Sequence, residues 1–281
     1  MNRRQLLAGV LGTLVSAPLW SAPDPRLLDL QLEEQISKAQ KLCVEAGETY
    51  QNWLNGRVSS HVARAEVGSR LQKLEAFQKK AAVLAVPASQ TSVRHWARMQ
   101  KQELQYFWSD MQKGSSAAQT QAQLQQRWQN AVGIQADLLE TRRRQLKVVE
   151  KLRDNQQLGS YYHWRNSILI VMQSELALAQ EVAEAFQQQN KSAMLTRRAI
   201  SLYDQASLIQ PPPSCLAAHQ LYLERFTSLS KLCRSAQLAI TAPDADTVAN
   251  LQDDEEAYRK KALASDDASL AALRSLLSKT R

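Results

Sequence analysis

The chain has 281 residues, 35 Lys and Arg against 27 Asp and Glu, and a hydrophobic share of 44%. That share is close to the average of folded globular proteins. Glycine and proline number only 8 each, whereas glutamine occurs 32 times. Sheet-containing folds of this length need many tight turns, and these turns use glycine and proline. The composition therefore argues against a TIM barrel, a Rossmann domain and a β-sandwich, and it favours long helices.

The first 22 residues are organised like a signal peptide. Arg3 and Arg4 form a basic start, an apolar stretch runs from Leu6 to Val15, and small residues end the segment. The stretch is too short and too interrupted by glycine for a membrane span. The paired arginines followed by Gln5 resemble the twin-arginine signal class, which carries folded proteins across a membrane. We expect export to the periplasm, with a general secretory signal as the alternative route and an N-terminal membrane anchor if the segment is not cleaved.

Removal of residues 1–22 leaves 33 basic and 27 acidic residues, a net charge of +6. This is a modest excess for a chain of this length. It is consistent with loose association with an anionic surface and does not indicate a nucleic-acid-binding protein. We expect an envelope protein or an anionic surface as partner, no nucleic acid, and no transmembrane span in the mature chain.

Apolar residues that recur at alternating spacings of four and three predict amphipathic helices along the whole mature chain. Glycine, proline and serine mark the breaks between them. The expected helices cover, in chain order, about 28–55, 59–85, 89–112, 117–154, 159–187, a shorter one at 193–208, 213–240 and 245–278. No stretch shows the period-two alternation of a strand.

The predicted fold is all-α: an elongated bundle of about seven long antiparallel helices with short connections. Residues 23–281 are expected to form a single domain, with a sub-boundary near 113–117. A weak repeat at an offset of 124 residues matches Pro87 with Pro211 and His95 with His219. His219 lies on an apolar helix side and His95 does not, so we do not expect an internal duplication.

The three cysteines, Cys43, Cys215 and Cys233, all fall on apolar helix sides. Cys215 and Cys233 are five helical turns apart, roughly 27 Å along one helix, whereas a disulfide needs Cα atoms within about 7 Å. An exported protein can therefore pair Cys43 with Cys215 or Cys43 with Cys233. The alternative is that all three are small buried apolar residues.

Known catalytic and metal-binding motifs are absent. The four histidines, His61, His95, His163 and His219, form no HxxxH or HExxH pattern, and none follows a glutamate at the spacing used in di-iron bundles. There is no CxxC pair and no glycine-rich phosphate loop. We expect no metal, no cofactor and no catalytic residue.

Two basic segments are candidates for a binding surface. Arg94, Trp96, Arg98 and Trp108 combine aromatic and basic side chains on one expected helix, although aromatic residues at helical spacing more often belong to a core. Arg143, Lys147 and Lys151 share one face of another helix, which is also the pattern of an ordinary solvated face.

These observations predict an exported envelope protein that acts by binding or by structural interaction. One alternative is an enzyme or cofactor carrier that uses twin-arginine export because it folds before crossing the membrane. Another is a coiled-coil adaptor that forms a homo-oligomer, which the sustained heptad spacing allows.

Overall fold

The structure is a computed structural model that describes residues 24–113, 121–152, 155–188, 194–242 and 244–279. Within these ranges it contains eight α-helices, two short 3-10 helices and no strand. The α-helices are α1 (Pro25–Leu54), α2 (Ser60–Leu84), α3 (Gln90–Gln112), α4 (Gln121–Val149), α5 (Gln156–Gln188), α6 (Leu195–Ser207), α7 (Leu216–Thr241) and α8 (Ala245–Ser278). The all-α prediction is confirmed, and seven of the eight helices are long. The expected signal segment at 1–22 lies outside the described residues.

Local sequence sets several of the helix ends. The side chains of Asp24 and Ser59 accept hydrogen bonds from backbone N–H groups in the first turns of α1 and α2. Asp244 and Thr247 form a reciprocal capping box at the start of α8. Gly56 has a φ of 69° just after α1, a conformation that glycine adopts without steric cost. The expected boundaries agree with the observed ones within a few residues because these signals are local.

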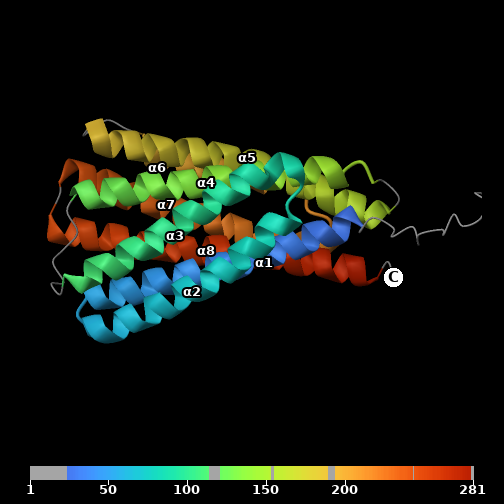
Figure 1. Cartoon of the computed structure of the whole chain (residues 1–281). Coiled ribbons are helices and arrows are strands. Elements are labelled where there is room, and N and C mark those ends of the chain that lie inside the picture. Colours follow the sequence, from blue (N-terminus) through green and yellow to red (C-terminus); the bar gives the residue numbers. More distant parts are fainter. Residues whose placement is uncertain (1–23, 114–120, 153–154, 189–193, 243, 280–281) are drawn as a thin grey trace, which may run out of the picture.

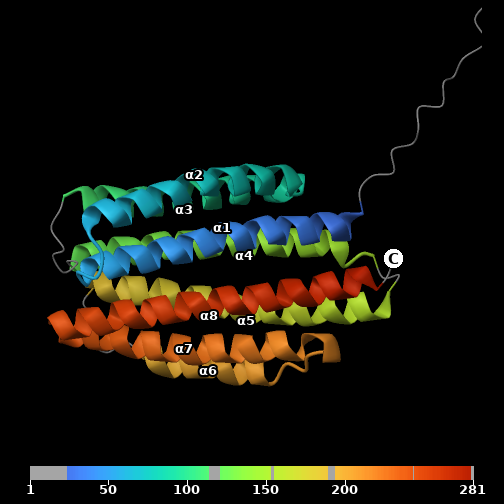
Figure 2. The same cartoon turned by 90° about the horizontal axis from the view of Figure 1, so that it is seen from below.

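The helices form an elongated stack of four layers (Figure 1, Figure 2). Figure 2 shows α2 and α3 in one outer layer, then α1 and α4, then α5 and α8, and finally α6 and α7 in the opposite outer layer. Consecutive helices pack against each other in each half, and the two halves meet through α4 against α5 and α1 against α8.

Helices α1–α4 and α5–α8 repeat one order of elements. A 3-10 helix beginning with proline precedes the third helix of each half, η1 (Pro87–Ser89) before α3 and η2 (Pro213–Cys215) before α7. The helix lengths differ most at the second position, where α2 has 25 residues and α6 has 13. The weak sequence repeat at an offset of 124 residues thus coincides with a repeated order of helices, although the side chains on matching helices differ.

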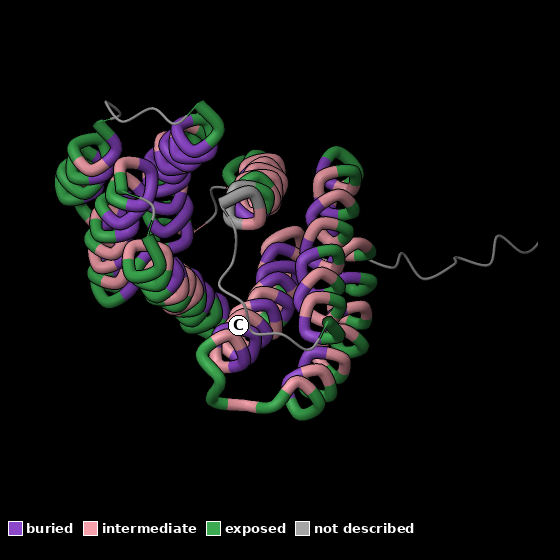
Figure 3. The backbone as a smooth tube through the Cα atoms, turned by 90° about the vertical axis from the view of Figure 1, so that its left-hand side faces the viewer, coloured by how far each residue is buried: buried purple, intermediate pink, exposed green. Residues whose placement is uncertain are grey.

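The interior contains two separate apolar cores. The first core is formed by α1, α2 and α3 with Leu138 of α4. The second core is formed by α5–α8 together with Trp128, Leu139, Leu146 and Val149 of α4. Figure 3 looks along the bundle and shows the buried residues on the inward sides of the helices in both halves. Helix α4 therefore contributes one side to each core.

The expectation about membrane spans concerns the mature chain. Among the helices described, none combines the length and the apolar character that crossing a membrane requires.

Candidate functional site: the polar layer between the two halves

The aromatic and basic residues of α3 that were candidates for a binding surface do not lie together. Trp96 is buried in the first core with 1% of its surface exposed, so it lines no surface. Arg94 and Arg98 are exposed on another side of the helix. Trp108 is half-buried, and its ring lies 4.7 Å from the guanidinium of Arg64. The structure therefore does not assemble these four residues into a ligand-stacking wall.

The second basic segment, Arg143, Lys147 and Lys151, lies only partly on the surface. Lys147 on α4 and Lys151 just beyond the helix are exposed, and Arg143 is half-buried. Their neighbour Arg142, however, is 5% exposed and points into the bundle. The run of three arginines is thus not a uniform solvated face.

Neither of the possible disulfides, Cys43 with Cys215 or Cys43 with Cys233, is present. Cys43, Cys215 and Cys233 are all free and buried. Cys43 packs in the first core, whereas Cys215 and Cys233 pack in the second. The structure therefore excludes the proposed Cys43 disulfides and agrees with the alternative, three small buried apolar residues. Helix periodicity shows that a helix side is apolar, but it does not show which other apolar side that helix faces. Burial raises the pKa of all three thiols, that of Cys233 to about 12.

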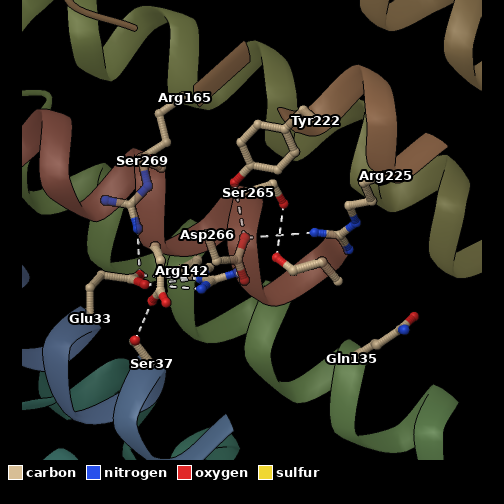
Figure 4. Close-up of polar contacts among 12 residues, drawn as sticks. Glu33, Ser37, Gln135, Arg142, Arg165, Tyr222, Arg225, Ser265, Asp266 and Ser269 are labelled. Atoms are coloured by element: carbon tan, nitrogen blue, oxygen red, sulfur yellow. Dashed lines mark hydrogen bonds and ion pairs between the residues drawn. The ribbon is translucent and has the colours of Figure 1, made fainter. Parts of the chain in front are cut away.

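Between the two cores lies a layer of buried ion pairs that includes Arg142 (Figure 4). The guanidinium of Arg142 donates to Glu33 of α1 through Nε and Nη2, at 3.2 and 3.0 Å, and to Asp266 of α8 through Nη1 at 2.8 Å. Arg165 of α5 donates to Asp29 through Nη1 at 3.1 Å and also to Glu33. One connected network therefore joins α1, α4, α5 and α8.

The network continues toward α7. Arg225 binds Glu175 of α5 with two parallel hydrogen bonds of 2.9 and 2.7 Å, the geometry that gives strong guanidinium–carboxylate pairs. The hydroxyl of Tyr258 donates to Glu175 at 2.6 Å, and that of Tyr222 donates to Asp266 at 3.0 Å. We call the charged members of this network the Arg142 cluster, which comprises Asp29, Glu33, Arg142, Arg165, Glu175, Arg225 and Asp266.

The Arg142 cluster contains four carboxyl groups and three guanidinium groups. Asp29 is bound by Arg165 alone among these guanidiniums. Burial, opposed by Arg165 and reinforced by Glu33, raises the pKa of Asp29 to about 6. Burial also opposes ionisation of Asp266, but Arg142 and Arg225 hold its pKa below the ordinary value. The cavity enclosed by the cluster is about 10 Å³, close to the room that one water needs.

A second set of buried ion pairs lies farther along the same layer. Arg259 of α8 donates through Nη2 to Glu103 of α3 at 2.9 Å and to Glu255 at 2.8 Å. Arg127 of α4 lies 3.5 Å from Glu255. We call these four residues the Arg259 cluster, and it holds two carboxylates and two guanidiniums. Burial opposes ionisation of Glu255, but Arg127 and Arg259 keep its pKa below the ordinary value.

Beside the Arg259 cluster is a groove of about 100 Å³ bordered by α1, α3, α4 and α8. Val44, Ile134 and Leu263 contribute apolar wall, and Glu103 and Arg259 contribute the ion pair. Cys43 also lines the groove. The polar layer therefore has a filled region around Arg142 and an open region around Arg259.

Sequence reasoning missed both clusters, although a signal was present. Arg225 lies three residues after Tyr222 and four before Leu229, which places it on the apolar side of α7. Charged residues at such positions are rarely buried unless they are paired. The pattern thus marks Arg225 as a buried charge, but it does not name Glu175 as the partner.

No group of three or more His, Cys, Asp or Glu side chains among the residues that the structure describes is arranged to hold a metal ion. Comparison of the chain with family models, with curated proteins and with solved structures gave no match.

Proposed function

We propose that the protein is an exported envelope protein that acts by binding, and that its partner is a protein that contacts the outer layer formed by α6 and α7. The observation that carries the proposal is the distribution of exposed large apolar side chains. In the described part of α6, α7 and their ends, these residues are Met194, Ile200, Tyr203, Leu208, Leu216 and Leu238. The opposite outer layer, α2 and α3, carries only Val62 and Val83 among its described residues.

Isolated exposed apolar residues are normal on a protein surface, whereas groups of them mark interaction sites. Ile200 and Tyr203 are three residues apart and share one side of α6. Leu208, 82% exposed, and Leu216, 58% exposed, flank the proline segment between α6 and α7. We call Ile200, Tyr203, Leu208 and Leu216 the α6–α7 face.

A matched pair of double variants tests this face. Ile200→Ser with Tyr203→Ser removes apolar surface from α6, and Val62→Ser with Val83→Ser removes it from α2 in the opposite layer. We expect a partner cross-linked to the wild-type protein in its native host to be lost with the α6 variant and kept with the α2 variant. Equal recovery with both variants would contradict the proposal.

The same face is available to a second copy of this chain, which is the adaptor alternative. Sedimentation of the purified protein distinguishes the two. A concentration-dependent dimer that the α6 variant converts to a monomer would assign the face to self-association and would contradict a partner of a different sequence.

Export is proposed on the pattern of residues 1–22. Replacement of Arg3 and Arg4 by lysine is expected to block transport by the twin-arginine route, because that route reads the arginine pair. The measurement is the distribution of the protein between cytoplasmic and periplasmic fractions. Unchanged export would contradict the twin-arginine route, and a protein found only in the cytoplasm in its native host would contradict export.

A further inference from the structure

Exposed basic side chains lie in the same outer layer as the α6–α7 face. Arg197 is three residues before Ile200 and therefore shares one side of α6 with it. On α7, Lys231 is three residues before Arg234, and Arg234 is four residues before the exposed Leu238. All three cations are exposed. We call Arg197, Lys231 and Arg234 the basic edge.

The members of the basic edge lie toward the same end of the layer. The chain reverses direction at the proline segment, so α6 and α7 pack side by side and run antiparallel (Figure 2). Helix α6 has 13 residues and α7 has 26, and the start of α6 lies beside the second half of α7 (Figure 2). Arg197 is in the first turn of α6, and Lys231 and Arg234 are in the second half of α7.

The cations of the basic edge are not neutralised within the described part of the chain. The ion pairs that α6 and α7 form there belong to other residues, namely Arg198 with Glu181, Arg225 with Glu175 and Asp266, and Glu224 with Lys261. Besides Glu224, the acidic residue of these two helices is Asp204. The layer therefore presents three exposed cations and one exposed carboxylate without an ion pair.

This charge restricts which protein can dock on the α6–α7 face. A partner on this face lies next to the basic edge, where further positive charge is repelled. Carboxylates at the rim of the contact pair with these cations and speed the encounter. A symmetric dimer through this face brings the basic edges of two copies into one interface, which is unfavourable. The charge therefore favours an acidic partner of a different sequence.

The outward side of α7 favours a protein over an anionic lipid surface as this partner. Between Leu216 and Leu238 it carries Gln220, Glu224 and Thr227 at helical spacing. A helix that lies in a membrane surface buries a continuous apolar side. Protein interfaces instead combine apolar residues with a polar rim, which is the composition found here.

We infer that the partner presents an acidic amphipathic segment to this layer. Its apolar side packs on Ile200 and Tyr203, and its carboxylates pair with the basic edge. The inference rests on the proposed function, because it specifies the chemistry of the partner that docks on the same face.

Synthetic peptides of defined sequence test the inference on the full-length mature protein. The glutamate peptide is an amphipathic helix of about 20 residues with leucine on one side and glutamate on the other. The glutamine peptide has glutamine in place of glutamate. We expect the glutamate peptide to bind about tenfold more tightly at low ionic strength, through three exposed charge pairs. The advantage is expected to shrink as salt is added, and calorimetry measures both affinities.

Two matched triple variants assign this preference to the basic edge. Replacement of all three of its cations by glutamine is expected to abolish the preference for the glutamate peptide. The control replaces Lys73, Arg94 and Arg98 by glutamine. These cations are exposed on α2 and α3 in the opposite outer layer, so the net charge changes equally and the preference is expected to remain.

The inference is overturned by no saturable binding of the glutamate peptide, by equal affinity for the two peptides, or by the same loss of preference in both triple variants. It is also overturned if the glutamate peptide does not bind while wild type, but not the basic-edge variant, sediments with phosphatidylglycerol vesicles. That result would assign the layer to an anionic membrane.

The cross-linked partner separates this inference from the proposed function. Loss of the partner with Ile200→Ser and Tyr203→Ser, but not with the basic-edge variant, would support the proposed function and overturn the inference. Loss of the partner with both variants, and not with the Lys73, Arg94 and Arg98 control, is the result expected if both hold.

Discussion

The Arg142 cluster and the Arg259 cluster occupy one polar layer between the two halves but differ in charge and in packing. The Arg142 cluster has four carboxyl groups for three guanidiniums, and its cavity is about 10 Å³. The Arg259 cluster has two of each and borders a groove of about 100 Å³. The side chain of Arg142 is 5% exposed and that of Arg259 is 19% exposed.

The two clusters therefore show two arrangements of buried charge at one interface. One has a surplus carboxyl in a closed site, and the other has equal numbers of carboxylates and guanidiniums beside an open groove. Where the layer is closed, burial raises the pKa of the surplus carboxyl, Asp29, and the single ion pair with Arg165 only partly offsets this effect. Where the layer is open, every charge has a partner and the remaining space is accessible. Buried ion pairs add little net stability but strongly penalise the loss of one partner. We therefore interpret both clusters as devices that fix how the two halves pack.

The largest expected effect is the loss of Arg142. Arg142→Met leaves Glu33 and Asp266 without their shared guanidinium in a closed site, so we expect unfolding free energy to fall by about 3–5 kcal/mol at pH 7. Arg259→Met is the matched control and is expected to cost about 2 kcal/mol, because water reaches its more exposed site. Urea unfolding followed by circular dichroism measures both. Equal losses would remove the distinction between the clusters.

Asp29→Asn is expected to have an effect that depends on pH. The pKa of Asp29 is about 6 in the folded protein against 3.8 for the free side chain, so its contribution to stability is fully present below pH 3.8 and is lost as pH rises through about 6. Asparagine mimics the protonated form at every pH. We expect the variant to match wild type near pH 4 and to be more stable by about 3 kcal/mol at pH 8.

Thermal unfolding of wild type and Asp29→Asn across this pH range provides the measurement. Asp253→Asn is a suitable control because Asp253 lies on the exposed side of α8. If wild type and Asp29→Asn differ in stability by the same amount at all pH values, the pKa of Asp29 is not raised in the folded protein.

Glu255→Gln probes the balanced cluster and is expected to give the opposite pH dependence. The pKa of Glu255 is lowered in the folded state, so its contribution is present above pH 4.5 and is lost as pH falls through the folded pKa. We expect the variant to be less stable than wild type by about 2 kcal/mol at pH 7. The difference is expected to shrink in acid, and a difference that grows in acid would contradict the assignment.

The smallest expected effect concerns Gln145, one turn beyond Arg142 on α4. Its side chain is 1% exposed, and both polar atoms of its amide lack a hydrogen-bond partner. Replacement by the similarly shaped methionine removes a buried amide, so we expect Gln145→Met to stabilise the protein by about 1 kcal/mol. Calorimetric unfolding measures this gain. Destabilisation would indicate that the amide is satisfied in solution.

The local part of the architecture could be predicted from the amino-acid sequence. The spacing of Leu32, Ile36 and Ala39 indicates a helix side without reference to the rest of the chain, and these residues are buried as expected. Pro87 and Gly56 mark helix breaks through their own backbone preferences. The same reasoning could not choose partners, and it therefore joined Cys43 to cysteines that pack in the other core.

The candidate site could not be predicted in this way because its members are far apart along the chain. Glu33, Arg142 and Asp266 are separated by more than 100 residues at each step, and each alone resembles an ordinary surface charge. Helical periodicity shows which side of a helix is apolar. It does not show which charged residue of another helix lies opposite that side. Trp96, one of the candidates for a binding surface, belongs to the core, which is what aromatic residues at helical spacing more often indicate.

The sequence by itself determined that this protein is helical and, to within a few residues, where each helix begins and ends, because backbone propensity, capping and apolar spacing act over a few residues. Only the tertiary structure decided that α4 serves two cores, that Arg142 and Arg259 are paired inside the molecule, and that a groove remains between the halves. These features depend on contacts between helices that are distant in the chain. The ion pairs contribute to stability only once folding has brought their charges together.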